Sequence, residues 1–328
     1  MLYIRPSFYD KFKCIADKCT DSCCIGWEIN IDNETMDIYN NMPTEFGEKI
    51  RENIVENEDG THSFKLCKDE RCPFLNEKNL CDIITDCGEE NICYICSEHP
   101  RFYNDFPDVT EYGLGLCCEE VCRLLLENDE PLKFVAFEDE TECYFENYED
   151  EVESYSKIYN VRNQIYEILE LNISYAEKIQ RIINFLENYN GEKITISSDY
   201  EILQMYKKTE PINDEWIEYF ESLKNSIDDI LRNEKPFDET SNGDSKYSKI
   251  LNYVIYRHLM KSAFFDISSF IGCVNFCVSS VRFIKLCDIK TYVENGCVKE
   301  IDRINNVKRW SKQIEYSEEN VLLLLSVK

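Results

Sequence analysis

Apolar residues recur at helical spacing through the second half of the chain. Residues 179, 182, 183 and 186 are Ile, Ile, Ile and Leu, a spacing that places them on one face of a helix. The same spacing returns at 220–231, and a third apolar stripe begins at Ile250 and continues to Leu286. A polar loop is expected at 238–246. Residues 154–328 are therefore predicted to form a helical bundle.

The first half of the chain shows weaker periodicity. Ile25, Trp27, Ile29 and Ile31 alternate with other residues, which is typical of a short, half-buried strand. A further short strand is predicted at 132–137. The expected fold class is mainly α with minor β. Its three parts are a cysteine-rich module over 1–126, an acidic connector over 127–153 and a helical domain over 154–328.

Acidic residues dominate the charge of the chain. Asp and Glu number 64 against 36 Lys and Arg, for a formal net charge of −28. This field repels phosphate backbones, so nucleic acid is not an expected partner. The simplest interpretation is that the charge keeps the chain soluble. A sharper alternative is that the acidic stretch 127–153 forms a wall facing a lysine-bearing substrate.

Nothing near residue 1 resembles a signal peptide. The longest uninterrupted apolar run, Val321–Leu325, is far shorter than the roughly 20 residues of a membrane span. We therefore expect a soluble, cytoplasmic protein without a transmembrane segment. Thiols stay reduced in that compartment, so the 18 cysteines are expected to be thiols or metal ligands rather than disulfides.

The cysteines are clustered along the sequence. Fourteen of the 18 lie between Cys14 and Cys143. The dense blocks are C-x4-C-x3-C-C at 14–24, Cys72 to Cys81, C-x2-C at 93–96, and the pair Cys117–Cys118. Four thiolates suit tetrahedral zinc or a cubane iron–sulfur cluster. The blocks predict metal binding, either at two centres or at one centre with spare thiols nearby.

Some cysteines are better explained as packing residues. Those in the apolar helical part are predicted to be buried free thiols: Cys273, Cys277, Cys287 and Cys297. The same reading suits individual members of the first group, namely Cys67, Cys87, Cys122 and Cys143. The C-x3-C-x2-C spacing of radical enzymes is absent, because Gly26 stands where its third cysteine would be.

Three segments resemble the flagellin lysine-N-methylase family, which is itself similar to the zinc- or iron-chelating cysteine-cluster proteins. They are YDKFKCIADKCTDSCCIGWEINID at 9–32, CPFLNEKNLCDI at 72–83 and ICYICSEHPRFYNDFPDVTEYGLGLCCEEVCRLLL at 92–126. YRHLMKSAFFD at 256–266 is a weaker match. The resemblance implies methyl transfer from S-adenosylmethionine to lysine side chains of flagellin, aided by an oxygen-sensitive four-iron–four-sulfur cluster.

The resemblance also implies a set of metal ligands. Carried over residue by residue, the set is Cys14, Cys19, Cys23, Cys24, Cys72, Cys81, Cys93, Cys96 and Cys118. Cys117 matches only part of the family, and Glu120 and Arg123 match its short polar signature without an assigned role. Zinc is the alternative metal, and with it the alternative function: a non-enzymatic zinc- or iron-binding module for protein interaction.

The sequence does not show where S-adenosylmethionine or the lysine would bind. Gly113-Leu114-Gly115 is too short and wrongly placed for the glycine-rich turn of a nucleotide-binding fold. Trp27 is a candidate to contact a cationic sulfonium, although packing on the predicted strand is the favoured role for it. Catalytic and cofactor-binding residues therefore stay unassigned.

Overall fold

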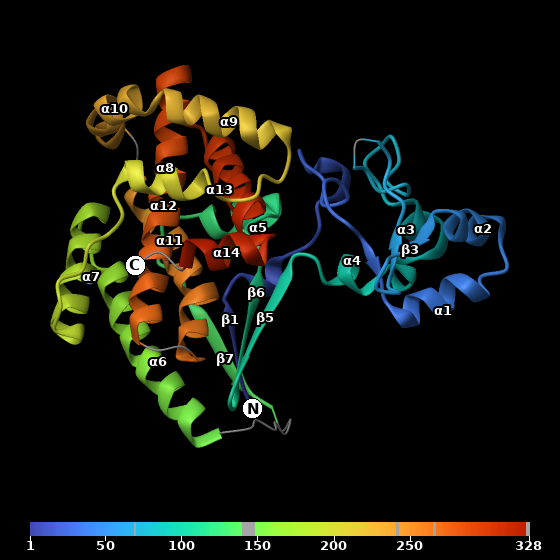
Figure 1. Cartoon of the computed structure of the whole chain (residues 1–328), viewed down its shortest axis with the longest axis horizontal. Coiled ribbons are helices and arrows are strands. Elements are labelled where there is room, and N and C mark those ends of the chain that lie inside the picture. Colours follow the sequence, from blue (N-terminus) through green and yellow to red (C-terminus); the bar gives the residue numbers. More distant parts are fainter. Residues whose placement is uncertain (69, 140–147, 241–242, 265–266, 326–328) are drawn as a thin grey trace. The chain divides into compact units, whose positions relative to one another are not determined.

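The computed structural model describes residues 1–68, 70–139, 148–240, 243–264 and 267–325. The chain forms two compact units. The larger contains residues 1–12, 102–117 and 121–328, and the smaller contains 13–101 with 118–120. Helices predominate over strands, which confirms the predicted fold class (Figure 1). The smaller unit is shorter than the expected module over 1–126, because residues 1–12 and 102–117 pack with the helical part.

A mixed four-stranded sheet in the order β5-β6-β1-β7 belongs to the larger unit. Its central strand β1, Leu2–Pro6, pairs in parallel with β6, Val109–Leu114. On its other side β1 pairs antiparallel with β7, Phe134–Glu138. The edge strand β5 spans Arg101–Phe106. β7 confirms the strand predicted at 132–137, and the predicted connector therefore includes part of the sheet, although its residues 140–147 lie outside the described part.

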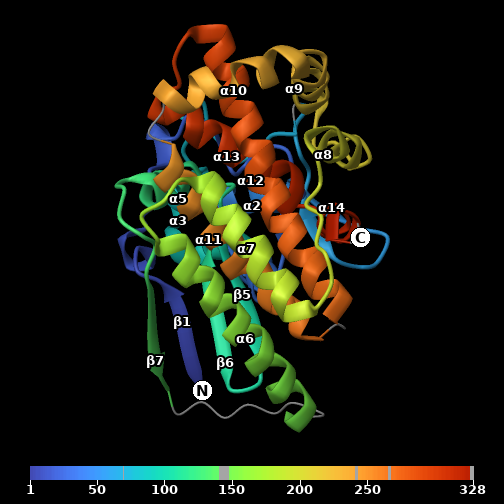
Figure 2. The same cartoon turned by 90° about the vertical axis from the view of Figure 1, so that its left-hand side faces the viewer.

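Two long helices cover one face of this sheet. They are α6, Tyr148–Glu170, and α11, Asp244–His258, and Figure 2 shows α6 in front of the strands. The Tyr253 hydroxyl of α11 donates to the Leu114 carbonyl at 2.7 Å, and the Tyr256 hydroxyl donates to the Ile4 carbonyl at 2.6 Å. These phenols satisfy buried backbone carbonyls and so fix the helix against the sheet.

The remaining helices confirm the helical prediction for 154–328. Their bounds are α7 Tyr175–Asn190, α8 Asp199–Tyr206, α9 Asp214–Asn225, α10 Ile227–Thr240, η4 Leu259–Phe264, α12 Ile267–Asn295, α13 Glu300–Glu315 and α14 Glu318–Leu325. Helix α5, Glu119–Leu126, lies before this region. Local sequence sets several ends: Ser174 and Glu177 form a capping box at the start of α7, and Gly191 ends it with a φ of 75°. The loop expected at 238–246 is shorter, since α10 runs to Thr240 and α11 begins at Asp244.

Helix α12 is the most apolar element of the chain. Its segment Phe270–Asn295 is long and apolar enough to cross a membrane, but 89% of the apolar window is buried inside the structure. Its residues contact α10, α11, α13 and η4. This is the environment of the core helix of a water-soluble protein.

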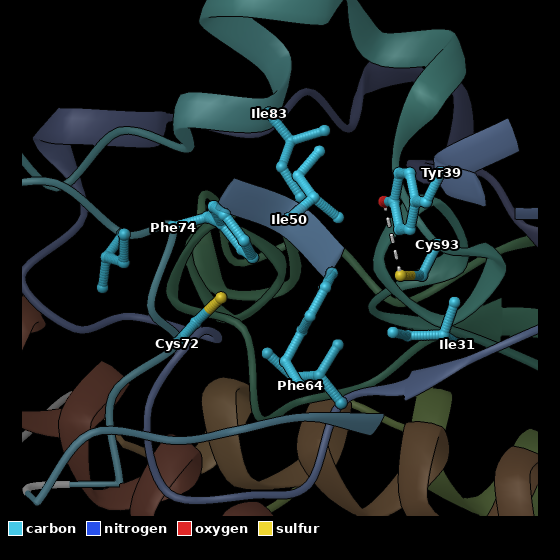
Figure 3. Packing of buried hydrophobic residues seen from close by; sticks show 10 residues of the cluster. Ile31, Tyr39, Ile50, Phe64, Cys72, Phe74, Ile83 and Cys93 are labelled. Carbon is cyan, nitrogen blue, oxygen red and sulfur yellow. Dashed lines mark hydrogen bonds between the residues drawn. The ribbon is translucent and has the colours of Figure 1, made fainter. Parts of the chain in front are cut away.

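The smaller unit combines a three-stranded sheet with short helices. The strands are β2 Asn30–Ile31, β3 Ile54–Glu56 and β4 His62–Phe64, in the order β2-β4-β3. The helices are α1 Asn33–Asn41, α2 Glu45–Glu52, α3 Asp82–Cys87 and α4 Tyr94–Glu98, with η2 Ala16–Lys18 and η3 Glu89–Asn91; η1 Tyr9–Lys11 precedes them in the larger unit. Phe64, Phe74 and Tyr39 pack together in its core (Figure 3).

The strand predicted at 25–31 is wrong in length. Only Asn30 and Ile31 are β2, and Ile25 forms an isolated bridge with Arg71. Gly26 between them has a φ of 89°, a left-handed conformation that interrupts an extended chain. The inward-facing part of the pattern is retained, because Ile29 and Ile31 are both buried.

Candidate metal centre

Backbone contacts bring three cysteine blocks together in the smaller unit. The Cys72 amide donates to the Cys24 carbonyl at 2.8 Å, which joins the first block to the second. Leu75 and Cys81 form an antiparallel bridge that folds the second block back on itself. The third block is attached through α4, where the Tyr94 amide donates to the Asp32 carboxylate at 2.8 Å. These protein–protein contacts thus hold cysteine-bearing segments that are distant in sequence close to one another.

Five thiols gather at that point, and we call them the inner thiols: Cys24, Cys72, Cys81, Cys93 and Cys96. Their proximity is shown by the effect of each thiol on the pKa values of its neighbours. Burial, together with negative charge on the neighbouring thiols Cys24, Cys81 and Cys93, raises the pKa of Cys72 to about 12. The pKa of Cys96 is raised by its hydrogen bond to Cys93 and by burial, with charge on Cys24 and Cys72 adding to this.

Two thiol pairs within this region share a proton. Cys24 accepts a hydrogen bond from Cys23, which lowers the pKa of Cys24 to about 7 and raises the pKa of Cys23. In the same way Cys93 accepts from Cys96, which lowers the pKa of Cys93. The guanidinium of Arg71 also lowers the pKa of Cys24. The Cys24 thiolate is therefore accessible near neutral pH, and the lowered pKa of Cys93 acts in the same direction. Thiolate is the form that binds metals.

Apolar packing surrounds the inner thiols on one side. Cys93 is 1% exposed and Cys72 is 6% exposed, both within the core that Figure 3 shows. The Tyr39 hydroxyl lies 3.7 Å from the Cys93 sulfur and 2.8 Å from the Asn91 carbonyl, to which it donates. Such a shell limits solvent access and orients ligands at metal sites.

A second group of predicted ligands lies towards the surface, and we call them the outer thiols: Cys14, Cys19, Cys23 and Cys118. Charge on Cys14 and on Cys118 contributes to the raised pKa of Cys23, which shows that the three are neighbours. Cys19 lies 3.8 Å from a carboxylate oxygen of Glu119, which also accepts from the Thr20 amide at 3.0 Å. Cys23 and Cys24, adjacent in sequence, connect the outer group to the inner one.

The donor set suits a soft metal in its chemistry. Thiolates select zinc, copper(I) and iron–sulfur clusters, and the inner thiols alone exceed the four that one such centre takes. In the described part of the chain, however, no three His, Cys, Asp or Glu side chains converge closely enough to hold an ion as they stand. Cys23 and Cys24 are hydrogen-bonded to each other, and so are Cys93 and Cys96. Ligation would require these side chains to rotate towards a common centre.

The other cysteines lie apart from the two groups. Cys273, Cys277 and Cys287 are buried in α12, as predicted for packing thiols. Cys297 is exposed, so its predicted burial is wrong: it follows Gly296, where α12 has already ended. Cys117 and Cys122 are buried in the larger unit, Cys67 is exposed, and Cys143 lies outside the described residues. All cysteines that the structure describes are free thiols.

Residues that the sequence did not single out support the inner thiols. Tyr39 gave no signal beyond an apolar position in α1. Arg71 could have been identified from the sequence, because it is a cation directly before Cys72. Its side chain donates to the Leu75 and Asn76 carbonyls at 3.2 and 2.7 Å. Asp32 caps α1 and also binds the start of α4, so one carboxylate serves two helices.

Trp27 lies near the outer thiols rather than on a strand. Its indole nitrogen donates to the Cys23 carbonyl, and its ring lies 5.9 Å from the ring of His99. The ring is half-buried, so the core position favoured for it from the strand pattern is wrong. Glu120 is buried at the start of α5, whereas Arg123 is half-exposed and lies 3.8 Å from Glu127.

These features define a cysteine-cluster protein: a small unit ordered around gathered thiols, within a chain that is otherwise helical. Comparison with known proteins relates it to lysine-N-methylases. The chain is 27% identical over 133 residues, 39% of its length, to the Lysine-N-methylase of Salmonella typhimurium and to that of Salmonella choleraesuis. The same identity over 133 residues links it to the Flagellar biosynthetic protein FliU of Salmonella muenchen.

The extent of these matches differs between the relatives. The matched stretch is 33% of each Lysine-N-methylase and 79% of the FliU protein. No family model matches the chain, and no solved structure matches it. The chain is therefore similar to proteins named Lysine-N-methylase over about two fifths of its own length and about a third of theirs.

Proposed function

We propose that this protein is a protein-lysine N-methyltransferase that acts on flagellin in the cytoplasm, with S-adenosylmethionine as methyl donor. The observation that carries the proposal is the gathering of cysteines from three separate segments, in a chain related to proteins named Lysine-N-methylase. The name of the FliU relative supports flagellin as the substrate. Reduced thiols throughout the described cysteines are in keeping with the cytoplasm.

We further propose a four-iron–four-sulfur cluster at the inner thiols. Four of the five would ligate it, and Tyr39 would lie against the ligand Cys93. When bound, such a cluster supplies a Lewis-acidic iron or an electron, depending on whether all four irons carry cysteine ligands. The outer thiols would then form a second centre or remain as spare thiols.

The lysine substrate imposes its own requirement on the chain. An ordinary lysine has a pKa near 10.4, so at neutral pH nearly all of it is the ammonium, which has no lone pair to attack a methyl group. A site must therefore remove the proton and exclude water around the amine. A strongly acidic protein attracts cationic substrates at long range, in accord with its net charge of −28.

The test begins with protein purified without oxygen. A brown colour with absorption near 400 nm, together with iron and sulfide, would indicate the cluster; a colourless protein that holds zinc would favour the alternative interaction module. The cluster-loaded protein is then incubated with flagellin and methyl-labelled S-adenosylmethionine, and the flagellin peptides are weighed. We expect added mass of about one methyl group on lysine.

Two variants give the assay its specificity. Cys96→Ser should lose iron and methyl transfer together. Cys87→Ser is the matched control, because Cys87 belongs to the same unit but contacts the Met42 sulfur at 3.8 Å rather than the inner thiols. Cluster-loaded protein that adds no methyl group to flagellin would contradict the proposed activity, and full iron content in Cys96→Ser would contradict the proposed ligands.

A further inference from the structure

A cavity of about 600 Å³ lies within the larger unit, among elements that contain none of the predicted ligands. It is bounded by the end of α6, the start of α7, the start of α11 and the segment 129–132. Both lysines that line it, Lys178 and Lys249, are 7% exposed. Buried polar side chains therefore face a space large enough for a small molecule.

The two lysines lack ionic partners. The Lys178 ammonium donates to the Leu169 carbonyl at 2.7 Å and to the Ser248 hydroxyl at 3.1 Å. The Lys249 ammonium donates to the side chain and the carbonyl of Asn128 at 2.9 and 3.1 Å. Among the described residues, no carboxylate oxygen lies within 4.0 Å of either ammonium. Asp244 acts on Lys178, and Asp129 on Lys249, only from beyond that distance. A buried ammonium without a carboxylate in direct contact is costly, and an anion in the cavity would offset that cost.

The start of α11 adds positive potential at the same place. Its N-cap residue, Gly243, offers no side-chain acceptor to the first amides of this 15-residue helix, and Asp244 and Ser245 line the cavity. The first amides of a helix carry partial positive charge and favour anions. Asn252, one turn beyond Ser248, is 4% exposed and lines the cavity, and its Oδ1 has no hydrogen-bond partner. The Asn252 Oδ1 can therefore accept a hydrogen bond from a ligand.

The mouth of the cavity has the opposite charge. Asp129, Glu170 and Asp244 line it and are all exposed, while the lysines lie inside. Asp129 is engaged by Lys246 at 3.3 Å, which leaves Glu170 and Asp244 to face a ligand. An anion alone would be repelled by these carboxylates on entry. A molecule with an anionic end and a cationic end satisfies both parts.

We propose that this cavity binds a small zwitterion of the α-amino-acid class. Its carboxylate points towards Lys178 and Lys249, and its ammonium donates to Asn252 and lies near the acidic mouth. The proposal rests on the cavity and does not depend on the proposed function. The same chemistry is found in a free amino acid and in the amino-acid end of S-adenosylmethionine, and only the second source would connect this site with methyl transfer.

The test is calorimetric titration of the whole chain with each of the 20 standard amino acids, S-adenosylmethionine, inorganic phosphate and methylamine. We expect one or more of the zwitterions to bind at least tenfold more tightly than phosphate or methylamine. Binding of S-adenosylmethionine alone would assign the site to the methyl donor; binding of a free amino acid would assign it to a separate ligand. No binding by any zwitterion, or tighter binding of phosphate alone, would overturn the proposal.

Substitutions locate the binding. Lys178→Met should weaken it at least tenfold, and so should Asn252→Leu, which removes the acceptor proposed for the ligand's ammonium at similar side-chain volume. Lys290→Met is the matched control, because Lys290 is 6% exposed but is paired with Glu294 outside the cavity. Should Lys178→Met fail to fold, Asn252→Leu decides alone. Unchanged affinity in a folded variant of either residue contradicts the assignment to this cavity.

Discussion

Glu111 and Arg162 form an ion pair sealed from solvent inside the larger unit. Their side chains are 0% and 2% exposed, and Glu111 on β6 accepts from Arg162 on α6 through both carboxylate oxygens, at 2.7 and 2.5 Å. Three tyrosine rings enclose the guanidinium, those of Tyr159, Tyr166 and Tyr256. The pair fixes helix to sheet, but each charge is tolerable there only because the other is present.

Removing Arg162 alone should therefore be severe. We expect Arg162→Met to lower the free energy of unfolding by about 3–5 kcal/mol, since it leaves a buried, unpaired carboxylate. Glu111→Leu combined with Arg162→Met should recover much of that loss. The measurement is denaturant unfolding followed by tryptophan fluorescence, in which Trp310 reports on this unit. Lys157→Met, which breaks an exposed pair with Glu153, serves as the control and should leave the free energy of unfolding nearly unchanged, because solvent screens that pair. A double variant as unstable as the single one would contradict the explanation.

His258 makes the stability of the larger unit depend on pH. Burial lowers its pKa to about 4, although the hydrogen bond to Glu315 at 2.8 Å opposes this. The unfolded histidine binds a proton near pH 6.5, so the folded state loses stability as the pH falls from 6.5 towards 4. At about 1.4 kcal/mol per pKa unit, the loss by pH 4 is roughly 3 kcal/mol. In His258→Gln the free energy of unfolding should depend less on pH across this range. An unchanged pH dependence would assign the effect to other groups.

At the scale of elements, Gly113 shows why a glycine pair in this sequence is not a nucleotide-binding turn. It lies within β6, where a Cβ would come 2.7 Å from the Phe102 ring and 2.8 Å from the Tyr253 hydroxyl. The glycine is thus required by the close approach of β6 to β5 and α11 rather than by a phosphate.

Adding one methyl group here should loosen this contact. We expect Gly113→Ala to lower the free energy of unfolding by about 1–3 kcal/mol through overpacking. Combining it with Phe102→Leu, which shortens the nearest side chain, should give a smaller loss than the sum of the two single variants. The three unfolding free energies test this directly, and additive losses would mean that the ring is not what the methyl group meets.

The helices and strands with the clearest spacing of apolar residues were the easiest to predict from the sequence. The apolar stripe at 179–186 and the start of α11 stand out at a spacing of three and four residues, so these helices could be predicted with the side that each buries. β1 could not be found in this way, because five residues with three partly buried side chains carry almost no pattern. The predicted strand at 25–31 was cut short by Gly26, whose backbone conformation depends on its contact with Glu70.

Considered as a whole molecule, the chain places its cysteines in sequence blocks, and all the predicted ligands from these blocks lie in the smaller unit. The blocks did not reveal the division into inner and outer thiols, because that depends on backbone pairing between residues far apart, such as Cys24 with Cys72. Nor did they reveal Tyr39, whose position follows from the packing of α1 rather than from any spacing to a cysteine.

The two units should respond differently to loss of metal. If metal orders the smaller unit, a chelator should expose sites within 13–101 to trypsin while 121–325 stays resistant. Limited digestion followed by mass measurement of the fragments tests this. Cys24→Ser should resemble the chelated protein, and Cys297→Ser, an exposed cysteine in the larger unit, should resemble the untreated one. Equal resistance of 13–101 with and without chelator would contradict a metal-ordered unit.

The strand order of the larger sheet has a consequence for synthesis on the ribosome. β1 is made first, but it pairs Leu2 with Val109 and with Glu138, so its partners emerge only after the whole of 13–101. During that interval the smaller unit can already close on itself, while β1 remains an unpaired strand tethered to it. Such long-range pairing is slow and leaves edges open to wrong partners. Early folding of the smaller unit would shorten the effective chain separation between β1 and its partners, and so would favour correct pairing of this sheet.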